Sequence, residues 1–308
     1  TAASTEVSHL DTRLDSRPWS FSIPFTMKWL PILPALFVLP LVSTVAAPPI
    51  AAEVRTNGFA LGTQSYTFRK FTFEEACQKT ASAGLKTTEL FPGQVVSAAL
   101  PDQKTGPGVS ADGLAAIKAI LKKHDIRAVA IGVIKLDQDE AKARQVFEFA
   151  KELGIGVINT ESTDAIDTIE KLVKEFDIKV GYHNHPQRPN DANYKVWDPN
   201  YIVELTKGRD PRIGSCADMG HWTNSGLNAA DCIRILKGRV VSSHLKDIAQ
   251  GGTKCVPAGT GRAKLDTALA ALREIGFDGP ISIEHENNWD DNVPDVLTYV
   301  DLVKKLAK

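Results

Sequence analysis

The chain has 308 residues, with 36 basic and 37 acidic side chains, and its formal net charge is −1 at pH 7. Because no block of lysine or arginine stands out, this balance argues against a protein that follows a nucleic-acid backbone through a basic track. The four cysteines are widely spaced and form no Cys-x-x-Cys pair, so the sequence indicates no zinc site built from thiolates.

The first element in chain order has the pattern of a secretory signal peptide. Met27 precedes a largely apolar run over 29–45, which ends in the small residues Ala46 and Ala47. We expect residues 27–52 to be this signal and the protein to be exported, to the periplasm or the extracellular space. No stable membrane insertion is expected after cleavage, and an uncleaved anchor is the alternative.

The remaining chain divides into an upstream segment and one domain. Residues 1–26 show no hydrophobic period, so we expect them to be disordered and exclude them from the fold. Residues 53–308 have the length that a single (β/α)8 TIM barrel needs, which is about 250 residues.

Strand-like and helix-like segments alternate through this domain. The expected strands are short and rich in Val, Ile, Leu and Ala, as strands buried on both faces are. They cover 59–64, 85–90, 126–133, 155–160, 178–183, 212–217, 239–244 and 280–284. The expected helices cover 73–83, 112–123, 138–153, 165–176, 228–237, 264–275 and 294–307, and one more starts at Pro199 and stops at Gly208.

Local capping patterns support several of these helices. Thr72 and Glu75 have the spacing of a capping box, and Asp137 and Asp164 stand where they can cap or open the third and fourth helices. Eight strand–helix units favour a closed parallel barrel. An open doubly wound sheet is the alternative, but its usual Gly-x-Gly-x-x-Gly phosphate turn is missing after the first strand.

Four successive strands in the second half end in a side chain that can bind a metal. These residues are His183, Asp218, His244 and Glu284, and each interval between them is about one strand-plus-helix unit. We therefore expect all four at the same end of the barrel, where barrel enzymes build their active sites. Two imidazoles and two carboxylates suit a divalent ion such as Mn²⁺, Zn²⁺ or Co²⁺.

Short motifs surround three of these residues. They are Asp218-Met219-Gly220-His221-Trp222, His244-Leu245-Lys246-Asp247 and Glu284-His285-Glu286. As a set they resemble the xylose-isomerase-like superfamily of TIM barrels, an AP endonuclease family 2-like group that contains sugar phosphate isomerases and epimerases. The resemblance extends over residues 57–307.

The resemblance implies a ligand set and one departure from it. In the epimerases of this family, Glu, Asp, His and Glu on strands five to eight hold the metal, and the two Glu residues move protons. Asp218, His244 and Glu284 match this pattern, but His183 stands where the family has its first Glu. Metal binding is expected to survive this change, whereas a relay between two carboxylates is not.

Other residues are expected to act beside the metal. The catalytic candidates are Glu284, His183, Glu286 and Lys246. The candidates for substrate binding are His221, His185, Glu89, Trp222 and Arg262. For most of them an ordinary structural role is the alternative: a hydrogen bond to a ligand for His221, packing for Trp222, a loop role for Arg262, and an ion pair near Lys135 for Glu89.

The implied activity is a divalent-metal-dependent isomerase or epimerase of sugars or sugar phosphates. A base removes the proton next to a carbonyl, and the metal stabilises the resulting enediolate. One alternative is a lyase or hydratase on 3-keto-glycosides, which shares this first step, and another is a non-catalytic sugar-binding barrel. A DNA-repair enzyme of the endonuclease IV type fits less well, because the stretch 257–259 lacks the Asp-x-His that its site needs. The expected partner is a small sugar, and a homo-oligomer is compatible with the sequence.

Overall fold

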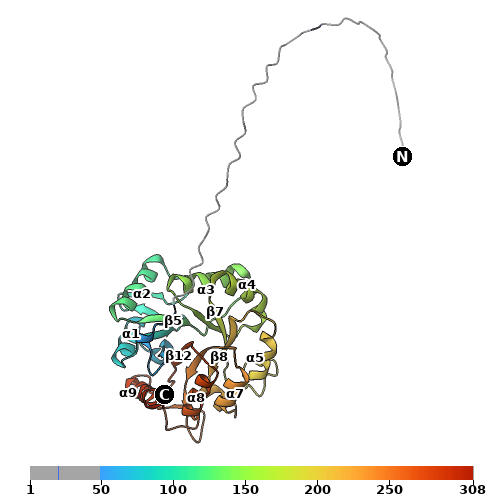
Figure 1. The fold of residues 1–308 in the computed structure, drawn as a ribbon. Helices are drawn as coiled ribbons and strands as arrows, with labels where there is room; N and C mark the ends of the chain where they lie inside the picture. The colour runs from blue at the N-terminus through green and yellow to red at the C-terminus, as the bar shows by residue number, and fades with distance from the viewer. Residues whose placement is uncertain (1–19, 21–48, 308) are drawn as a thin grey trace, which may run out of the picture. The chain divides into compact units, whose positions relative to one another are not determined.

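The structure is a computed structural model that describes Ser20 and residues 49–307. Eight parallel strands form a closed barrel in which each strand pairs with its neighbour and β12 closes onto β1. Figure 1 shows the helices surrounding these strands. The strands are β1 (Ala60–Gln64), β2 (Thr87–Leu90), β5 (Arg127–Ile131), β6 (Val157–Thr160), β7 (Lys179–His183), β8 (Ile213–Asp218), β9 (Val240–Leu245) and β12 (Pro280–Ile283). The predicted (β/α)8 barrel is confirmed.

The helices lie close to the predicted ranges. They are α1 (Phe73–Ser82), α2 (Ala111–Lys123), α3 (Glu140–Glu152), α4 (Ile166–Phe176), α5 (Pro199–Thr206), α7 (Ala229–Ile235), α8 (Leu265–Glu274) and α9 (Val293–Lys305). A further short helix, α6 (Met219–Asn224), follows β8 directly, and the 3₁₀ turns are η1 (Ala52–Val54), η2 (Ser65–Phe68) and η3 (Thr163–Ala165). Buried Leu, Ile, Val and Phe side chains between strands and helices make up the main apolar core.

The capping predictions are confirmed in part. Thr72 and Glu75 form the expected reciprocal capping box of α1. Asp137 does not cap α3, because Asp139 takes that place by accepting the amide of Ala141. The expected start at Asp164 was also early, since that residue lies in η3 and α4 begins at Ile166.

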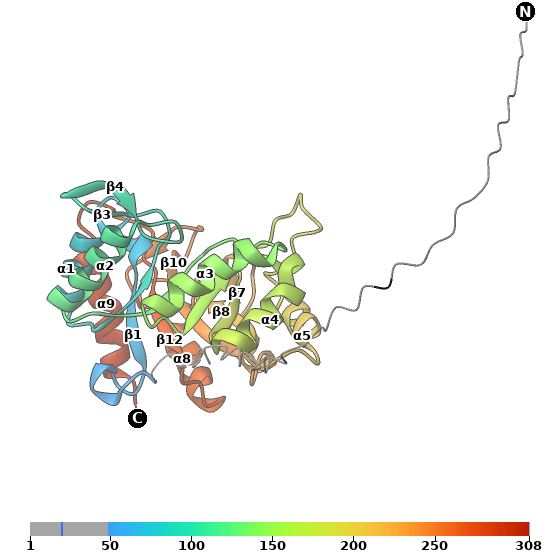
Figure 2. The same ribbon diagram turned by 90° about the horizontal axis from the view of Figure 1, so that it is seen from above.

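Two small hairpins interrupt the repeating pattern and were not predicted. The loop after β2 contains β3 (Val95–Ser97) and β4 (Leu100–Lys104), and the loop after β9 contains β10 (Asp247–Ile248) and β11 (Cys255–Val256). Both pairs are antiparallel and too short to give a periodic hydrophobic signal. Figure 2 shows the β3–β4 hairpin at the same side of the barrel as the loop between β7 and α5.

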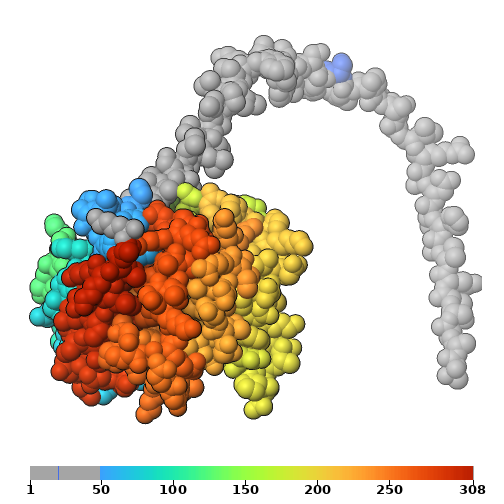
Figure 3. Space-filling view, turned by 60° about the horizontal axis from the view of Figure 1, so that its bottom comes forward, coloured from blue at the N-terminus to red at the C-terminus, as the bar shows by residue number. Residues whose placement is uncertain are grey.

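The beginning of the described chain is tied to the barrel. The guanidinium of Arg127 donates to the carbonyl of Pro49, and the side chain of Asn57 donates to the carbonyls of Val303 and Leu306. Figure 3 shows this segment, in blue, beside the dark red end of α9. Contacts with the barrel thus begin before the expected domain start at residue 53.

Most of the predicted signal peptide and upstream segment lies outside the described residues. The assignments of 1–26 and 27–52, and of export, therefore stay predictions. Within the described part of the chain, no helix is long and apolar enough to cross a membrane. All four cysteines lie in that part, where each is buried as a free thiol.

Gly214 permits the close approach of β8 and β9. A Cβ atom at this position would overlap the carbonyl oxygen of Arg239, which is backbone and cannot move aside cheaply. We expect Gly214→Ala to lower the free energy of unfolding by about 1–3 kcal/mol, as overpacking in a core does. Urea denaturation measures this, with Gly252→Ala as the control because a Cβ there meets no atom within 4 Å. Equal stability of the two variants would contradict this packing.

Candidate metal centre

The four predicted ligands are at one end of the barrel because they end neighbouring strands. His183, Asp218 and His244 lie within the last residues of β7, β8 and β9, and Glu284 directly follows β12. The strand register sets Asp218 directly opposite His244. The repeat seen in the sequence therefore brings the four side chains together.

Donor atoms from these side chains converge on one small volume. His183 Nε2 lies 3.1 Å from His244 Nδ1 and 3.6 Å from Asp218 Oδ2. His244 Nδ1 lies 3.0 Å from Glu284 Oε2 and 3.8 Å from Asp218 Oδ2. All four side chains are buried. Two nitrogens and two oxygens at these separations can share one cation.

His221 belongs to the same cluster. One ring nitrogen of His221, one of His183, and one carboxylate oxygen each of Asp218 and Glu284 all lie within 4.8 Å of one another. The backbone amide of His221 also donates to Asp218 Oδ1 at 2.7 Å, because Asp218 caps the short helix α6. The sequence predicts that His221 binds substrate. In the structure its imidazole lies among the candidate metal ligands and is a further possible donor to the ion.

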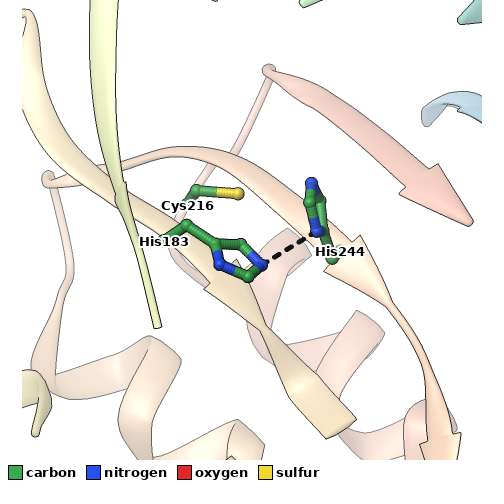
Figure 4. Close-up of side chains that lie close together, drawn as sticks. All are labelled: His183, Cys216 and His244. Carbon is green, nitrogen blue, oxygen red and sulfur yellow. Dashed lines mark hydrogen bonds between the residues drawn. The ribbon is translucent and has the colours of Figure 1, made fainter. Parts of the chain in front are cut away.

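Cys216, a residue of β8, lies beside His183 and His244. Figure 4 shows His183 and His244 facing each other with Cys216 next to them. Burial raises the pKa of this thiol. A protonated sulfur is a poor ligand for Mn²⁺ or Zn²⁺, so the chemistry favours the set that contains carboxylates.

The carboxylate of Glu89 contacts His244 and holds its ring in place. Its Oε2 lies 2.9 Å from His244 Nε2 and accepts a hydrogen bond of 2.7 Å from Ser282. Its Oε1 accepts from Asn159 at 2.8 Å and from Gln64 at 3.3 Å. With Nε2 on this carboxylate, Nδ1 of His244 is directed at the other ligands, the carboxylate–histidine arrangement that orients metal-binding imidazoles.

This arrangement changes the expected role of Glu89. Its side chain has no exposed surface and both oxygens are occupied, so it is placed as a partner of His244, away from any substrate. The expected alternative, an ion pair near Lys135, is wrong because Lys135 is exposed and the partner is His244. Burial disfavours its charge, but His244 together with the hydrogen bonds from Asn159 and Ser282 lowers the pKa of Glu89.

Lys246 brings a positive charge into the cluster. Its Nζ lies 2.9 Å from Glu284 Oε2, 3.3 Å from Asp218 Oδ2 and 3.0 Å from His221 Nε2. It also pairs with the carboxylate of Glu286. Burial would lower the pKa of Lys246, but Asp218, Glu284 and Glu286 raise it well above the usual value.

The cluster carries more negative than positive charge. Four carboxylates, those of Glu89, Asp218, Glu284 and Glu286, face one lysine and one histidine that is charged only when protonated. Even with both bases protonated, two negative charges remain uncompensated. A divalent cation supplies the missing charge, since isolated buried carboxylates are costly.

The donors themselves suit such an ion. Burial is the main cause that lowers the pKa of His183, so its imidazole is neutral and has a lone pair to offer. Asp218 Oδ2 is buried and has no well-aligned hydrogen bond among the described residues, although Lys246 Nζ lies 3.3 Å away as an ion pair. A buried carboxylate oxygen without a directed donor, beside the neutral imidazole of His183, fits a metal ligand.

A second group at the rim was missed by the sequence reasoning. Glu161, which follows β6, lies 2.7 Å from His185 Nδ1 and accepts a hydrogen bond of 2.6 Å from the Tyr194 hydroxyl. Although burial opposes its charge, His185 and Tyr194 lower the pKa of Glu161 to about 2. The only signal in the sequence was its position one residue beyond a strand, which it shares with Glu284.

Two of the predicted substrate-binding residues do not join the cluster. Trp222 is buried and its indole donates to the carbonyl of Trp197 at 3.0 Å, which is a packing role. The guanidinium of Arg262 donates to the carbonyls of Thr223 and Ala249 and so supports loops. A cavity of about 300 Å³ is lined by the N-terminal ends of β5, β6, β7 and β12 and lies at the opposite end of the barrel, where active sites are not built.

Comparisons with known proteins agree with this picture at the level of fold. A family model described as xylose isomerase-like TIM barrel matches residues 77–305. An uncharacterized protein of Methanocaldococcus jannaschii, MJ1311, is 28% identical over 129 residues. That match covers 41% of this chain and 43% of the relative, so less than half of the relative is spanned.

Solved structures superpose over most of the barrel. An uncharacterized protein from Parabacteroides distasonis is 27% identical, with a TM-score of 0.65, over 80% of this chain and 99% of that one. A D-tagatose 3-epimerase-like protein is 18% identical, with a TM-score of 0.60, over 79% and 97%. At that identity the second likeness supports the fold alone.

Replacing Glu89 tests whether it orients His244. Removing one partner of a buried charge pair costs about 3–5 kcal/mol, so we expect Glu89→Gln to lower the free energy of unfolding by that order in EDTA. Glu152→Gln is the control, because its pair with Lys118 is exposed and contributes at most about 1 kcal/mol. Urea denaturation distinguishes the two, and a stable Glu89→Gln variant would remove Glu89 from this role.

Proposed function

Because the chain belongs to the xylose isomerase-like TIM barrel family, we propose that it is a divalent-metal-dependent isomerase or epimerase of sugars or sugar phosphates. The observation that carries the proposal is the convergence of His183, Asp218, His244 and Glu284 on a volume with excess negative charge.

His183, Asp218, His244 and Glu284 would hold the ion, with His221 as a further donor. When bound, a divalent ion polarises a sugar carbonyl and stabilises the enediolate formed on proton removal. The protein then has to orient the sugar and move a proton between adjacent carbons or between the two faces of one carbon.

Lys246 and Glu286 are suited to the proton transfer. Their side chains form an ion pair at the mouth of the site. The Glu286 side chain is 32% exposed, whereas Glu89, Asp218 and Glu284 are buried, so Glu286 is the carboxylate of this set that a substrate can reach. Lys246 would stabilise a developing oxyanion, because its charge is secured by three carboxylates.

A lyase acting on 3-keto-glycosides remains the second candidate. Elimination next to a carbonyl begins with the same proton removal and needs the same metal position. The replacement of the family's glutamate by His183 favours keeping this candidate, because a second carboxylate for the opposite face is missing there. An isomerase and a lyase differ in whether a leaving group departs, which product analysis would establish.

Metal analysis tests the proposal directly. We expect about one divalent ion per purified chain, and loss of that ion in His244→Ala and Glu284→Ala. EDTA should abolish turnover, and in D₂O the ketose product should carry deuterium next to its carbonyl. The control is Glu274→Ala, an exposed surface carboxylate paired with Arg234. A metal-free protein whose activity is indifferent to EDTA would overturn the proposal.

Two substitutions test the unusual ligand His183. His183→Ala removes one donor and should weaken metal binding by more than about a hundredfold, since loss of a group that only orients a ligand already costs about tenfold to a hundredfold. His183→Glu introduces the family's residue, and we expect it to retain the metal because a carboxylate also binds these ions. Titration of the apoprotein with Mn²⁺ measures both affinities. If His183→Ala binds Mn²⁺ as tightly as the unaltered protein, His183 is no ligand.

A further inference from the structure

The loop between β7 and α5, residues 184–198, encloses a cavity of its own. Figure 2 shows this loop rising beyond the strand ends, in olive. Together with Tyr201 of α5 it surrounds a volume of about 390 Å³, which we name the loop cavity. Its lining includes Arg188, Ala192, Tyr194, Lys195, Trp197 and Tyr201. Volumes of roughly 300–1,000 Å³ are typical of small-molecule sites.

The loop cavity adjoins the metal position through Tyr194. The Tyr194 hydroxyl accepts a hydrogen bond of 2.8 Å from the His185 amide and donates to Glu161 at 2.6 Å. The ligand atoms of Glu161, His183 and His185 all lie within 4.8 Å of one another. Tyr194, a lining residue of the loop cavity, thus bonds to Glu161 and His185, which are neighbours of the metal-ligand candidate His183, and His185 is partly exposed.

The lining has the chemistry of a carbohydrate subsite. The lining contains the aromatic rings of Trp197 and Tyr201, and such rings pack against the C–H groups of a pyranose, whereas one face of the Tyr194 ring is already covered by Arg188. Arg188 and Lys195 offer donors for hydroxyl groups, and two aspartates in the same lining balance their charge. Arg188 is held over the Tyr194 ring at 3.7 Å from its centroid. A lining without excess charge favours a neutral, hydroxyl-rich ring over an anion.

We propose that the loop cavity binds a second sugar ring, so that the substrate is a disaccharide or another glycoside. The reacting ring would lie over the metal centre, and this part of the inference rests on the proposed function. The second ring would occupy the loop cavity, past His185 and Tyr194.

Binding measurements on the full chain test the second ring without requiring turnover. The probes are maltose, cellobiose, lactose, lactulose and sucrose, compared with glucose, galactose and fructose, each at millimolar concentration in EDTA and in Mn²⁺. Saturation-transfer NMR reports which ring touches the protein, and calorimetry gives the affinity. We expect at least one disaccharide to bind about tenfold more tightly than its components, with saturation on both rings.

A blocking substitution assigns the binding to the loop cavity. Ala192 is exposed and lines the cavity, so Ala192→Trp fills it while removing no contact of the metal centre. The matched control is Ala99→Trp, which adds the same bulk at the exposed turn between β3 and β4. We expect Ala192→Trp to abolish the preference for the disaccharide, and Ala99→Trp to keep it, with monosaccharide binding and metal content unchanged in both.

The outcomes separate this inference from the proposed function. It is overturned if no disaccharide binds more tightly than its components, or if the preference survives in Ala192→Trp. Either result together with a bound metal and turnover of a single sugar would leave the proposed function standing. Conversely, a preference that is lost in Ala192→Trp in a protein without metal or turnover would support the loop cavity and refute the proposed function.

Discussion

The orientation of His244 depends on a carboxylate, Glu89, that has no contact with solvent. Glu89 lies on β2, and its oxygens meet side chains from β1, β6, β9 and β12. This hydrogen-bond network around Glu89 therefore crosses the interior of the barrel and joins five strands through one side chain. Each partner satisfies part of the carboxylate, which makes burial of the charge tolerable. Because Glu89 contacts Nε2 of His244, the other ring nitrogen, Nδ1, faces Asp218 and Glu284.

Buried negative charge explains the position of Lys246 next to this network. Asp218 and Glu284 would repel each other in the absence of a cation, and Lys246 lies between them at hydrogen-bonding distance. The lysine lowers the pKa of both carboxyls, which keeps them ionised despite burial. The same ammonium reaches Glu286 at the mouth. Lys246 thus connects the ligands, which must stay ionised, with a carboxylate that has access to solvent.

The barrel and the convergence of four strand-end side chains could be predicted because both follow from repetition. Buried parallel strands give short apolar runs. The spacing from His183 to Asp218 and the spacing from Asp218 to His244 are each about one strand-plus-helix unit. The capacity of His, Asp and Glu side chains to bind a metal can be recognised from each residue alone. Those residues therefore come together whenever the eight units close, whatever the details of the loops.

Roles that depend on contacts across the barrel could not be predicted. The sequence places Glu89 at a strand end like the four proposed ligands, and only the closed barrel reveals that it points at His244. Arg262 follows a glycine-rich loop, but loop geometry decides that its donors meet backbone carbonyls. Glu161 had no neighbours in sequence to mark it, because its partners His185 and Tyr194 come from the loop after the next strand.

The ligands and the loop cavity are carried by different kinds of structure. His183, Asp218 and His244 belong to strands whose spacing is set by the barrel, whereas the cavity lies within the single connection 184–198 and the start of α5. Insertions and replacements are tolerated more readily in such a connection than in the strands. If the proposed roles hold, evolution, or an engineer who grafts a different segment between β7 and α5, can change which molecules are accepted without altering the strand-end residues.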